Sequence, residues 1–274
     1  SISADVGGVG QAINEGKTKY TAVEGIKETK QAIINKLKKD HNLDYTLDKI
    51  VISNGAKHSL FNLAQALIDE GDEVIIPSPY WVTYPELVVY SGGVPVFIET
   101  DESTEFKITA KQLKEKITPK TKILMLNSPS NPTGSIYSRE ELLAIGEVLK
   151  GTDIVVLSDE MYEKLIYKGK KFTATAEVSP DMYNRTVTIN GLSKSVAMTG
   201  WRFGYVACPN SALAKAMSTL QGQVTSNVNS MTQYAAIVAL EGYADKDIEM
   251  MRVEFEKRKD YAVKAINNIS KLSC

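Results

Sequence analysis

Residues 191–202 read GLSKSVAMTGWR, and they follow a β-branched run, TVTI at 186–189, that predicts a buried strand. Lys194 stands just past the end of this strand among small residues, a setting typical of a lysine that forms a covalent bond with a carbonyl group. Arg202 follows beside Gly200, and an arginine in such a loop can bind a phosphate through two parallel hydrogen bonds. The two side chains together predict a ligand that carries both a carbonyl group and a phosphate.

Pyridoxal phosphate carries an aldehyde and a phosphate, and we take it as the predicted ligand. A surface Ser-Lys loop with a structural arginine is the alternative interpretation of the same stretch. The Ser193-Lys194 dipeptide alone favours that alternative. The longer run and the motifs upstream of it favour the cofactor.

The composition is typical of a soluble globular enzyme. The chain has 274 residues, enough for one large core or two domains, and is 43% hydrophobic and 24% charged. The net charge of -1 does not favour binding to nucleic acid or to an acidic membrane by bulk electrostatics. The two cysteines, Cys208 and Cys274, stand far apart and in no metal spacing, so we expect no metal site and a reducing compartment. No stretch has the length of a membrane helix and no signal peptide is expected, which favours a cytoplasmic protein.

Strands and helices alternate along most of the chain. We expect strands at 49–52, 73–76, 94–98, 122–126, 154–157, 186–189 and 204–207. We expect helices at 26–41, 59–68, 82–90, 109–117, 138–149, 211–220, 230–240 and 245–269. Continuous apolar strands separated by helices predict an α/β fold, in which helices cover both faces of a mostly parallel sheet.

Polar and aromatic side chains recur where the predicted strands end. They are Lys57, Trp81, Asn131, Asp159, Tyr162 and Lys194. In an open parallel sheet the carboxyl ends of the strands lie along one edge, and ligands bind there. The sequence therefore predicts a single site at this edge.

Several motifs, in one order, resemble the signature of class I pyridoxal-phosphate-dependent aminotransferases, and more narrowly the prokaryotic aspartate aminotransferase group. They are Tyr20, GAK at 55–57, PYW at 79–81, NPTG at 131–134, DEMY at 159–162, SK at 193–194 and GWR at 200–202. The resemblance implies the large domain of fold type I over residues 16–245, with residues 1–15 as a remnant of an N-terminal segment. Residues 246–274 are then a long helix that leads toward a C-terminal small domain, which carries the arginine for the substrate α-carboxylate and lies outside this sequence.

The resemblance also assigns roles at the reactive end of the cofactor. Lys194 binds the aldehyde and later moves a proton at the substrate carbon, and Asp159 keeps the ring nitrogen protonated. Tyr162 and Asn131 donate hydrogen bonds to the ring oxygen, and Trp81 stacks on the ring face. The alternatives are a helix cap for Asp159, plain turn chemistry for Asn131 and core packing for Trp81.

The phosphate is expected at the start of a helix, where backbone N–H groups are free. Gly55, Ala56 and Lys57 supply this helix start, Arg202 binds the same phosphate, and Ser193 is a further hydroxyl donor. The resemblance implies a homodimer in which Tyr20 reaches the phosphate of the neighbouring site. An ordinary surface tyrosine is the alternative for Tyr20.

Lys57 bears on the substrate. In the resembling group a lysine here faces the distal carboxylate of a dicarboxylic substrate, and a cation in the side-chain pocket favours aspartate or glutamate. The alternative is a solvated lysine, although the helix dipole disfavours a cation at a helix start. With Trp81 and Asn131, Lys57 makes up the predicted substrate pocket.

The predicted activity is amino transfer between aspartate, or a related amino acid, and 2-oxoglutarate. Alternatives are an aromatic, alanine or prephenate aminotransferase, a C–S lyase on the same fold, or a non-catalytic regulatory domain that binds the cofactor. The glycine run at 7–10 follows no strand, so a nucleotide-binding domain is disfavoured. The two histidines, His41 and His58, are expected on helix surfaces without a role.

Overall fold

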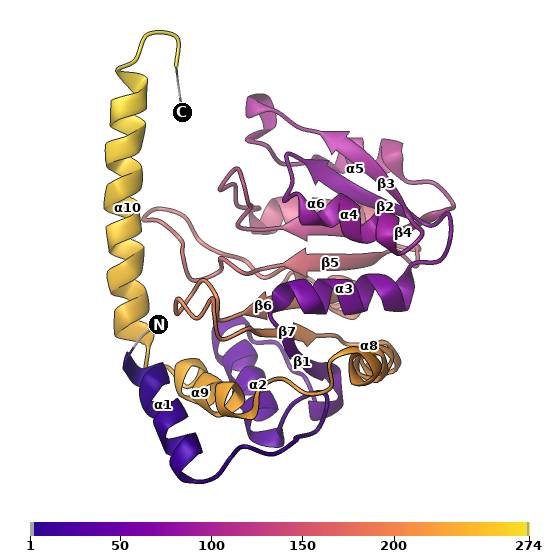
Figure 1. Cartoon of the computed structure of the whole chain (residues 1–274). Helices are drawn as coiled ribbons and strands as arrows, with labels where there is room; N and C mark the ends of the chain where they lie inside the picture. Colours follow the sequence, from indigo (N-terminus) through magenta and orange to yellow (C-terminus); the bar gives the residue numbers. More distant parts are fainter. Residues whose placement is uncertain (1–2, 273) are drawn as a thin grey trace.

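The computed structural model describes residues 3–272 and 274, with side chains for residues 7–272 and 274. One seven-stranded sheet, in the order β1-β7-β6-β5-β4-β2-β3, forms its centre (Figure 1). The strands are β1 (Ile50–Asn54), β2 (Glu73–Ser78), β3 (Val94–Glu99), β4 (Thr121–Asn127), β5 (Val155–Asp159), β6 (Thr186–Gly191) and β7 (Phe203–Ala207). β7 is antiparallel to its neighbours β1 and β6, and all other pairs are parallel.

Helices cover both faces of this sheet. The α-helices are α1 (Ser3–Asn14), α2 (Lys27–His41), α3 (Ala56–Leu67), α4 (Thr83–Tyr90), α5 (Ala110–Lys116), α6 (Arg139–Leu149), α7 (Pro180–Arg185), α8 (Ser211–Val224), α9 (Ser230–Leu240) and α10 (Asp245–Asn267). Three short 3₁₀ helices are η1 (Leu47–Lys49), η2 (Glu102–Thr104) and η3 (Thr175–Glu177). The predicted α/β architecture is confirmed.

The core divides by sheet face, as alternation along each strand requires. On one face Val51 and Val74 pack with apolar residues of α3, α4 and α8. On the opposite face Ile50 and Ile52 pack with α2 and α9. Further along that second face, Ile75 packs with residues of α5, α6 and α7. Because the strands inside the sheet bury both sets of side chains, they read as continuous apolar runs in the sequence, whereas the edge strand β3 is only partly buried.

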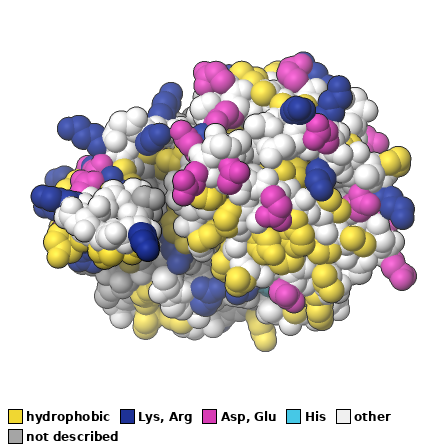
Figure 2. All heavy atoms as spheres, turned by 90° about the horizontal axis from the view of Figure 1, so that it is seen from above, with side chains coloured by type: hydrophobic (Ala, Val, Ile, Leu, Met, Phe, Trp, Pro, Cys, Tyr) yellow, Lys and Arg dark blue, Asp and Glu magenta, His cyan; other side chains and the backbone are white. Residues whose placement is uncertain are grey.

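Two elements lie at the periphery. α1 packs along α9, where Gly8 allows close approach because a Cβ there would lie 3.1 Å from the Cα of Ala235. α10 projects away from the sheet, and none of its residues is buried. α10 contacts the body where Nη1 of Arg252 donates to the backbone oxygen of Ile166, and Figure 2 shows acidic and basic side chains interspersed over the visible face.

The structure differs from the sequence prediction in a few elements. α7 was not predicted, because six residues beginning at Pro180 show no helical period. β7 is antiparallel because the loop at 192–202 returns the chain without a crossover helix. Among the described residues, the structure contains no helix that is both long and apolar enough to cross a bilayer.

Candidate active site

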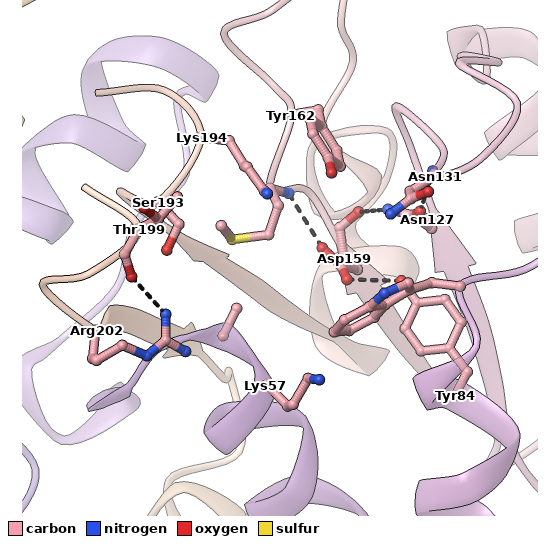
Figure 3. Close-up of a pocket in the computed structure, with 13 residues that line it drawn as sticks. Lys57, Tyr84, Asn127, Asn131, Asp159, Tyr162, Ser193, Lys194, Thr199 and Arg202 are labelled. Carbon is pink, nitrogen blue, oxygen red and sulfur yellow. Dashed lines mark hydrogen bonds between the residues drawn. The ribbon is translucent and has the colours of Figure 1, made fainter. Parts of the chain in front are cut away.

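A cavity of about 250 Å³ opens where the strands end (Figure 3). The register of the sheet places Asn127, Asp159 and Ile189 side by side at the ends of β4, β5 and β6. The residues that line the cavity are Ala56, Lys57, Trp81, Tyr84, Asn127, Asn131, Asp159, Met161, Tyr162, Ser193, Lys194, Thr199 and Arg202. The predicted position of the site, at the carboxyl edge of the sheet, is therefore where the structure has a cavity.

Asp159 is the acid of this cavity, and the residue is buried, with 5% of its surface exposed. The hydroxyl of Tyr84 donates a hydrogen bond of 2.7 Å to Oδ2, and the backbone N–H of Met161 donates one of 3.3 Å to Oδ1. Burial raises the pKa of Asp159 above its ordinary value, while these two donors act in the opposite direction. A buried carboxylate with spare acceptor capacity is suited to bind a cationic N–H group.

Asn127 ties the neighbouring loop to Asp159. Its side-chain Nδ2 donates to the backbone carbonyl oxygens of Asp159 at 3.0 Å and of Pro129 at 3.1 Å. Its Oδ1 accepts a hydrogen bond of 2.7 Å from the backbone N–H of Asn131. The side chain of Asn131 is thereby held on the same side of the cavity as Tyr162 (Figure 3).

Lys194 and Tyr162 lie together near Asp159. The Nζ atom of Lys194 is 5.8 Å from the centroid of the Tyr162 ring. Burial raises the pKa of Tyr162, the charge of Asp159 raises it further, and the side chain of Asn131 lowers it. Tyr162 therefore keeps its proton and can donate a hydrogen bond to an oxygen in the cavity.

At the other end of the cavity, the guanidinium group of Arg202 lies against the start of α3. Gly55 precedes the helix with a φ of 84°, and a Cβ there would lie 2.3 Å from Nη2 of Arg202. Arg202 itself has a φ of 55°, and its Nη1 donates to the backbone oxygen of Thr199 at 2.8 Å. No side chain among the residues that the structure describes caps the N-terminus of α3, so its first N–H groups and the guanidinium group are a set of donors suited to an anion.

Lys57 and Trp81 form the wall beside α3. The Nζ atom of Lys57 is 4.8 Å from the centroid of the Trp81 ring, close enough for a cation–π contact. The Trp81 ring in turn meets Tyr84 edge-on, with 5.6 Å between ring centroids. The ammonium group of Lys57 therefore lies at the cavity wall.

The predicted residues fall into two groups. Ala56, Lys57, Trp81, Asn131, Asp159, Tyr162, Ser193, Lys194 and Arg202 all line the cavity. Gly55 lies behind the cavity, where it makes room for Arg202, and Tyr20 lies outside it with 91% of its surface exposed. Sequence reasoning missed Tyr84 and Asn127, although Asn127 directly follows a predicted strand and could have been found by that signal.

The expectation that both histidines lie on helix surfaces is wrong. His41 is half-buried with a side chain that is 8% exposed, and its Nε2 lies 3.0 Å from Glu163 and its Nδ1 3.2 Å from Glu177. Nδ1 of His58 accepts a 3.2 Å hydrogen bond from the N–H of Asn54, and burial lowers the pKa of His58. The partners of His41 are more than a hundred residues away in the chain, so the local helical pattern does not indicate them.

Comparison with known proteins identifies the family. The sequence profile described as Aminotransferase class I and II matches residues 8–274. The chain belongs to this family. An aspartate aminotransferase of Geobacillus stearothermophilus is 50% identical over 264 residues, which are 96% of this chain and 67% of that protein. An aspartate/prephenate aminotransferase of Nitrosomonas europaea is 47% identical, over 96% of this chain and 66% of that protein.

The solved structures agree with the family assignment. The aspartate aminotransferase of Rhizobium meliloti superimposes with a TM-score of 0.97 at 42% identity, over 100% of this chain and 68% of that one. An aromatic aminotransferase of Pyrococcus horikoshii gives a TM-score of 0.94 at 34% identity, over 97% of this chain and 69% of that one. The chain thus spans about two thirds of the length of these relatives. It has the fold of a pyridoxal-phosphate-dependent aminotransferase related to the prokaryotic aspartate enzymes.

Pyridoxal 5'-phosphate is the cofactor of this family, and the donor set of the cavity fits it. An amine for the aldehyde is present in Lys194, and a buried carboxylate for the ring nitrogen in Asp159. The anion site of Arg202 and α3 lies at the end opposite to Asp159, as the phosphate requires. A Cβ at Gly204 would lie 2.3 Å from the N atom of Ala56, so glycine keeps the helix start open.

Proposed function

We propose that the protein moves an amino group from aspartate to 2-oxoglutarate, in two half-reactions, as a homodimer with shared sites. The observation that carries the proposal is that Lys194, Asp159 and Arg202 line one cavity together with the cation of Lys57. The family match and the names of the relatives support amino transfer. The relatives named for aspartate support a dicarboxylic substrate.

Bound pyridoxal phosphate supplies an aldehyde that accepts the substrate amine and a ring that withdraws electrons from the substrate carbon. The side chains divide the remaining work. Lys194 holds the aldehyde end and takes or returns a proton at the substrate carbon through its Nζ atom. Asp159 holds a proton on the ring nitrogen, because a buried carboxylate is stabilised by an adjacent cation. Tyr162 and Asn131 orient the ring through its oxygen.

The other end of the cavity contributes binding and orientation. Arg202 and the first N–H groups of α3 bind the phosphate as charge-assisted hydrogen-bond donors, with the Ser193 hydroxyl nearby. Trp81 covers one face of the ring. These contacts fix the reactive atoms relative to Lys194, which is the main contribution of a binding site to such a reaction.

Specificity for aspartate rests on Lys57. Its Nζ atom lies over the Trp81 ring at the cavity wall, where a second carboxylate of the substrate gains an ion pair. Alanine and phenylalanine lack that carboxylate. The relative named for aromatic substrates is less similar, at 34% identity, than the relatives named for aspartate. Aromatic transfer is therefore less well supported than aspartate transfer, whereas prephenate is named together with aspartate in the relative that is 47% identical.

The test compares amino donors with the whole protein and its Lys57→Ala variant. We expect kcat/KM for aspartate to fall about 10- to 100-fold in the variant, the effect of losing one charge-assisted contact. For alanine, kcat/KM should change less than about threefold. Lys116→Ala, which removes an exposed lysine on α5, is the matched control. A preference for alanine that Lys57→Ala does not alter would reject the aspartate assignment.

The homodimer is supported by Tyr20. This residue is 91% exposed, although the neighbouring Thr21 is held in place by a hydrogen bond from the side chain of Gln233. Such a side chain is suited to reach the phosphate in a neighbouring copy. Light scattering should give the mass of a dimer, and Tyr20→Phe should weaken cofactor binding. A fully active monomer would contradict this part of the proposal. A cytoplasmic location remains a prediction, consistent with free thiols at Cys208 and Cys274.

A further inference from the structure

Gln221 of α8 is fully buried and uses its whole hydrogen-bonding capacity on three separate segments. Oε1 accepts hydrogen bonds from Oγ of Ser53 at 2.7 Å and from Nδ2 of Asn62 at 3.0 Å. Nε2 donates to the backbone oxygens of Ile52 at 2.8 Å and Val23 at 2.9 Å. A primary amide has two donors and two acceptor lone pairs, so no other side chain of this size can replace it without leaving a buried group unpaired.

Two of these segments, the end of β1 and α3, enclose the phosphate turn, which we define as residues 53–56. Ser53 opens the turn, and its carbonyl oxygen accepts a 2.7 Å hydrogen bond from the N–H of Gly55. Asn62 lies further along α3, the helix that begins at Ala56. Because Gln221 binds Ser53 and Asn62 through one oxygen atom, it fixes the helix relative to the strand. Gly55 and Ala56, which meet the guanidinium group and the cavity, lie between these two contacts.

The third segment carries Tyr20. Gln221 holds this segment through the carbonyl of Val23, and Gln233 holds it at two other points. Gln233 Oε1 accepts from the N–H of Ile26 at 2.8 Å, and its Nε2 donates to Oγ1 of Thr21 at 3.1 Å. Hydrogen bonds from Gln221 and Gln233 therefore fix the backbone that follows the exposed Tyr20.

We infer that Gln221 is a positioning residue for the phosphate end of the site, although it does not line the cavity. It sets the phosphate turn in its own chain and, through Val23, the segment whose Tyr20 reaches the neighbouring site. The inference rests on the proposed roles of Arg202, the start of α3 and Tyr20. A displaced turn weakens binding of the phosphate and leaves Lys194 and Asp159 in place, since neither contacts Gln221.

The test measures dissociation constants of pyridoxal phosphate and of pyridoxal, which lacks the phosphate, by absorbance titration of the whole protein. Gln221→Glu keeps the shape but replaces the NH2 group, so at most one of the two donated hydrogen bonds, from a protonated carboxyl group, can remain. We expect the dissociation constant of pyridoxal phosphate to rise about tenfold, as for one displaced charge-assisted contact, and that of pyridoxal less than about threefold. Ser53→Ala removes a single contact and should shift the same ratio in the same direction. A merely destabilised protein would weaken both ligands alike.

Two further variants separate the possible outcomes. Thr152→Val removes a hydroxyl group that donates to the backbone oxygen of Leu149. Thr152 lies before the start of β5, at the end of that strand away from the cavity, so the variant should leave the dissociation constants of both ligands unchanged. Arg202→Ala should raise the constant for pyridoxal phosphate selectively. If it does not, the proposed phosphate site itself is wrong. Arg202→Ala can raise the dissociation constant of pyridoxal phosphate alone while Gln221→Glu and Ser53→Ala raise those of both ligands equally. This result would overturn the inference about Gln221 and leave the proposed function intact. Should Gln221→Glu not fold, the ratio for Ser53→Ala decides.

Discussion

Replacing Asp159 by asparagine should make the cofactor-free protein more stable and its complex with the cofactor less stable. Asp159 is 5% exposed, and among the described residues its carboxyl group accepts hydrogen bonds only from Tyr84 and Met161. None of the ion pairs among the described residues includes it. Such a partly compensated buried charge destabilises the folded state by about 1–3 kcal/mol. Asparagine has the same shape: its Oδ1 can accept from the N–H of Met161, and its Nδ2 can donate to the hydroxyl oxygen of Tyr84, which reverses the direction of that hydrogen bond. We therefore expect the free energy of unfolding to rise by that amount.

The pH dependence gives this prediction a sign that can be checked. Burial raises the pKa of Asp159 above its ordinary value of 3.8 in the folded protein. As the pH rises through 3.8 the unfolded chain loses this proton first, so the wild-type protein loses stability relative to Asp159→Asn. Urea unfolding of both cofactor-free proteins should therefore show a larger difference at pH 8 than at pH 4.

Adding pyridoxal phosphate should reverse the order at pH 8, because a ligand stabilises most the protein that binds it more tightly. The wild-type carboxylate pairs with the protonated ring nitrogen, whereas the neutral amide of the variant does not. A cofactor-free variant that is less stable than wild type at pH 8 would refute the reasoning, as would a stability difference that is the same at pH 4 and pH 8.

Two other perturbations test separate parts of the account. In Gly55→Ala the new Cβ would lie 2.3 Å from Nη2 of Arg202, on a backbone with a φ of 84°. We expect the affinity for pyridoxal phosphate to fall about tenfold or more in a titration. Unchanged affinity would contradict the packing argument. Burial alone would lower the pKa of His41, but Glu163 and Glu177 raise it to about 9. The protonated His41 therefore stabilises the folded state fully below pH 6.5, and this stabilisation is lost as the pH rises through 9. Denaturant unfolding should show that the free energy of unfolding falls by about 2–3 kcal/mol over this range. The same loss in His41→Gln would show that another group is responsible.

The local sequence pattern was sufficient to predict the strands and to place the residues that directly follow them. Asp159 follows a continuous apolar run, and parallel strands end at one edge of a sheet, so Asp159 and Lys194 could be placed together without coordinates. Ser138 is followed three residues later by Glu141, the local signature of a capping box, and the structure has this capping box at the start of α6. These features depend on a few neighbouring residues only.

Contacts between distant segments could not be predicted in this way. Tyr84 lies in a mostly apolar helix and resembles a core residue in the sequence, yet its hydroxyl binds Asp159, 75 residues away. Gln221 likewise stands in an ordinary amphipathic helix, and its partners come from β1, α3 and the segment before α2. A polar residue on the buried side of a helix shows its role only when its partners are known.

The most direct measurement of the central claim is reduction of the protein with borohydride in the presence of pyridoxal phosphate, followed by mass spectrometry of its peptides. Reduction makes the bond between a lysine and the cofactor permanent. We expect one pyridoxyl group per chain, on Lys194, and none in Lys194→Ala. A cofactor fixed to another lysine, or a protein that remains unmodified and colourless after the cofactor is added, would contradict it.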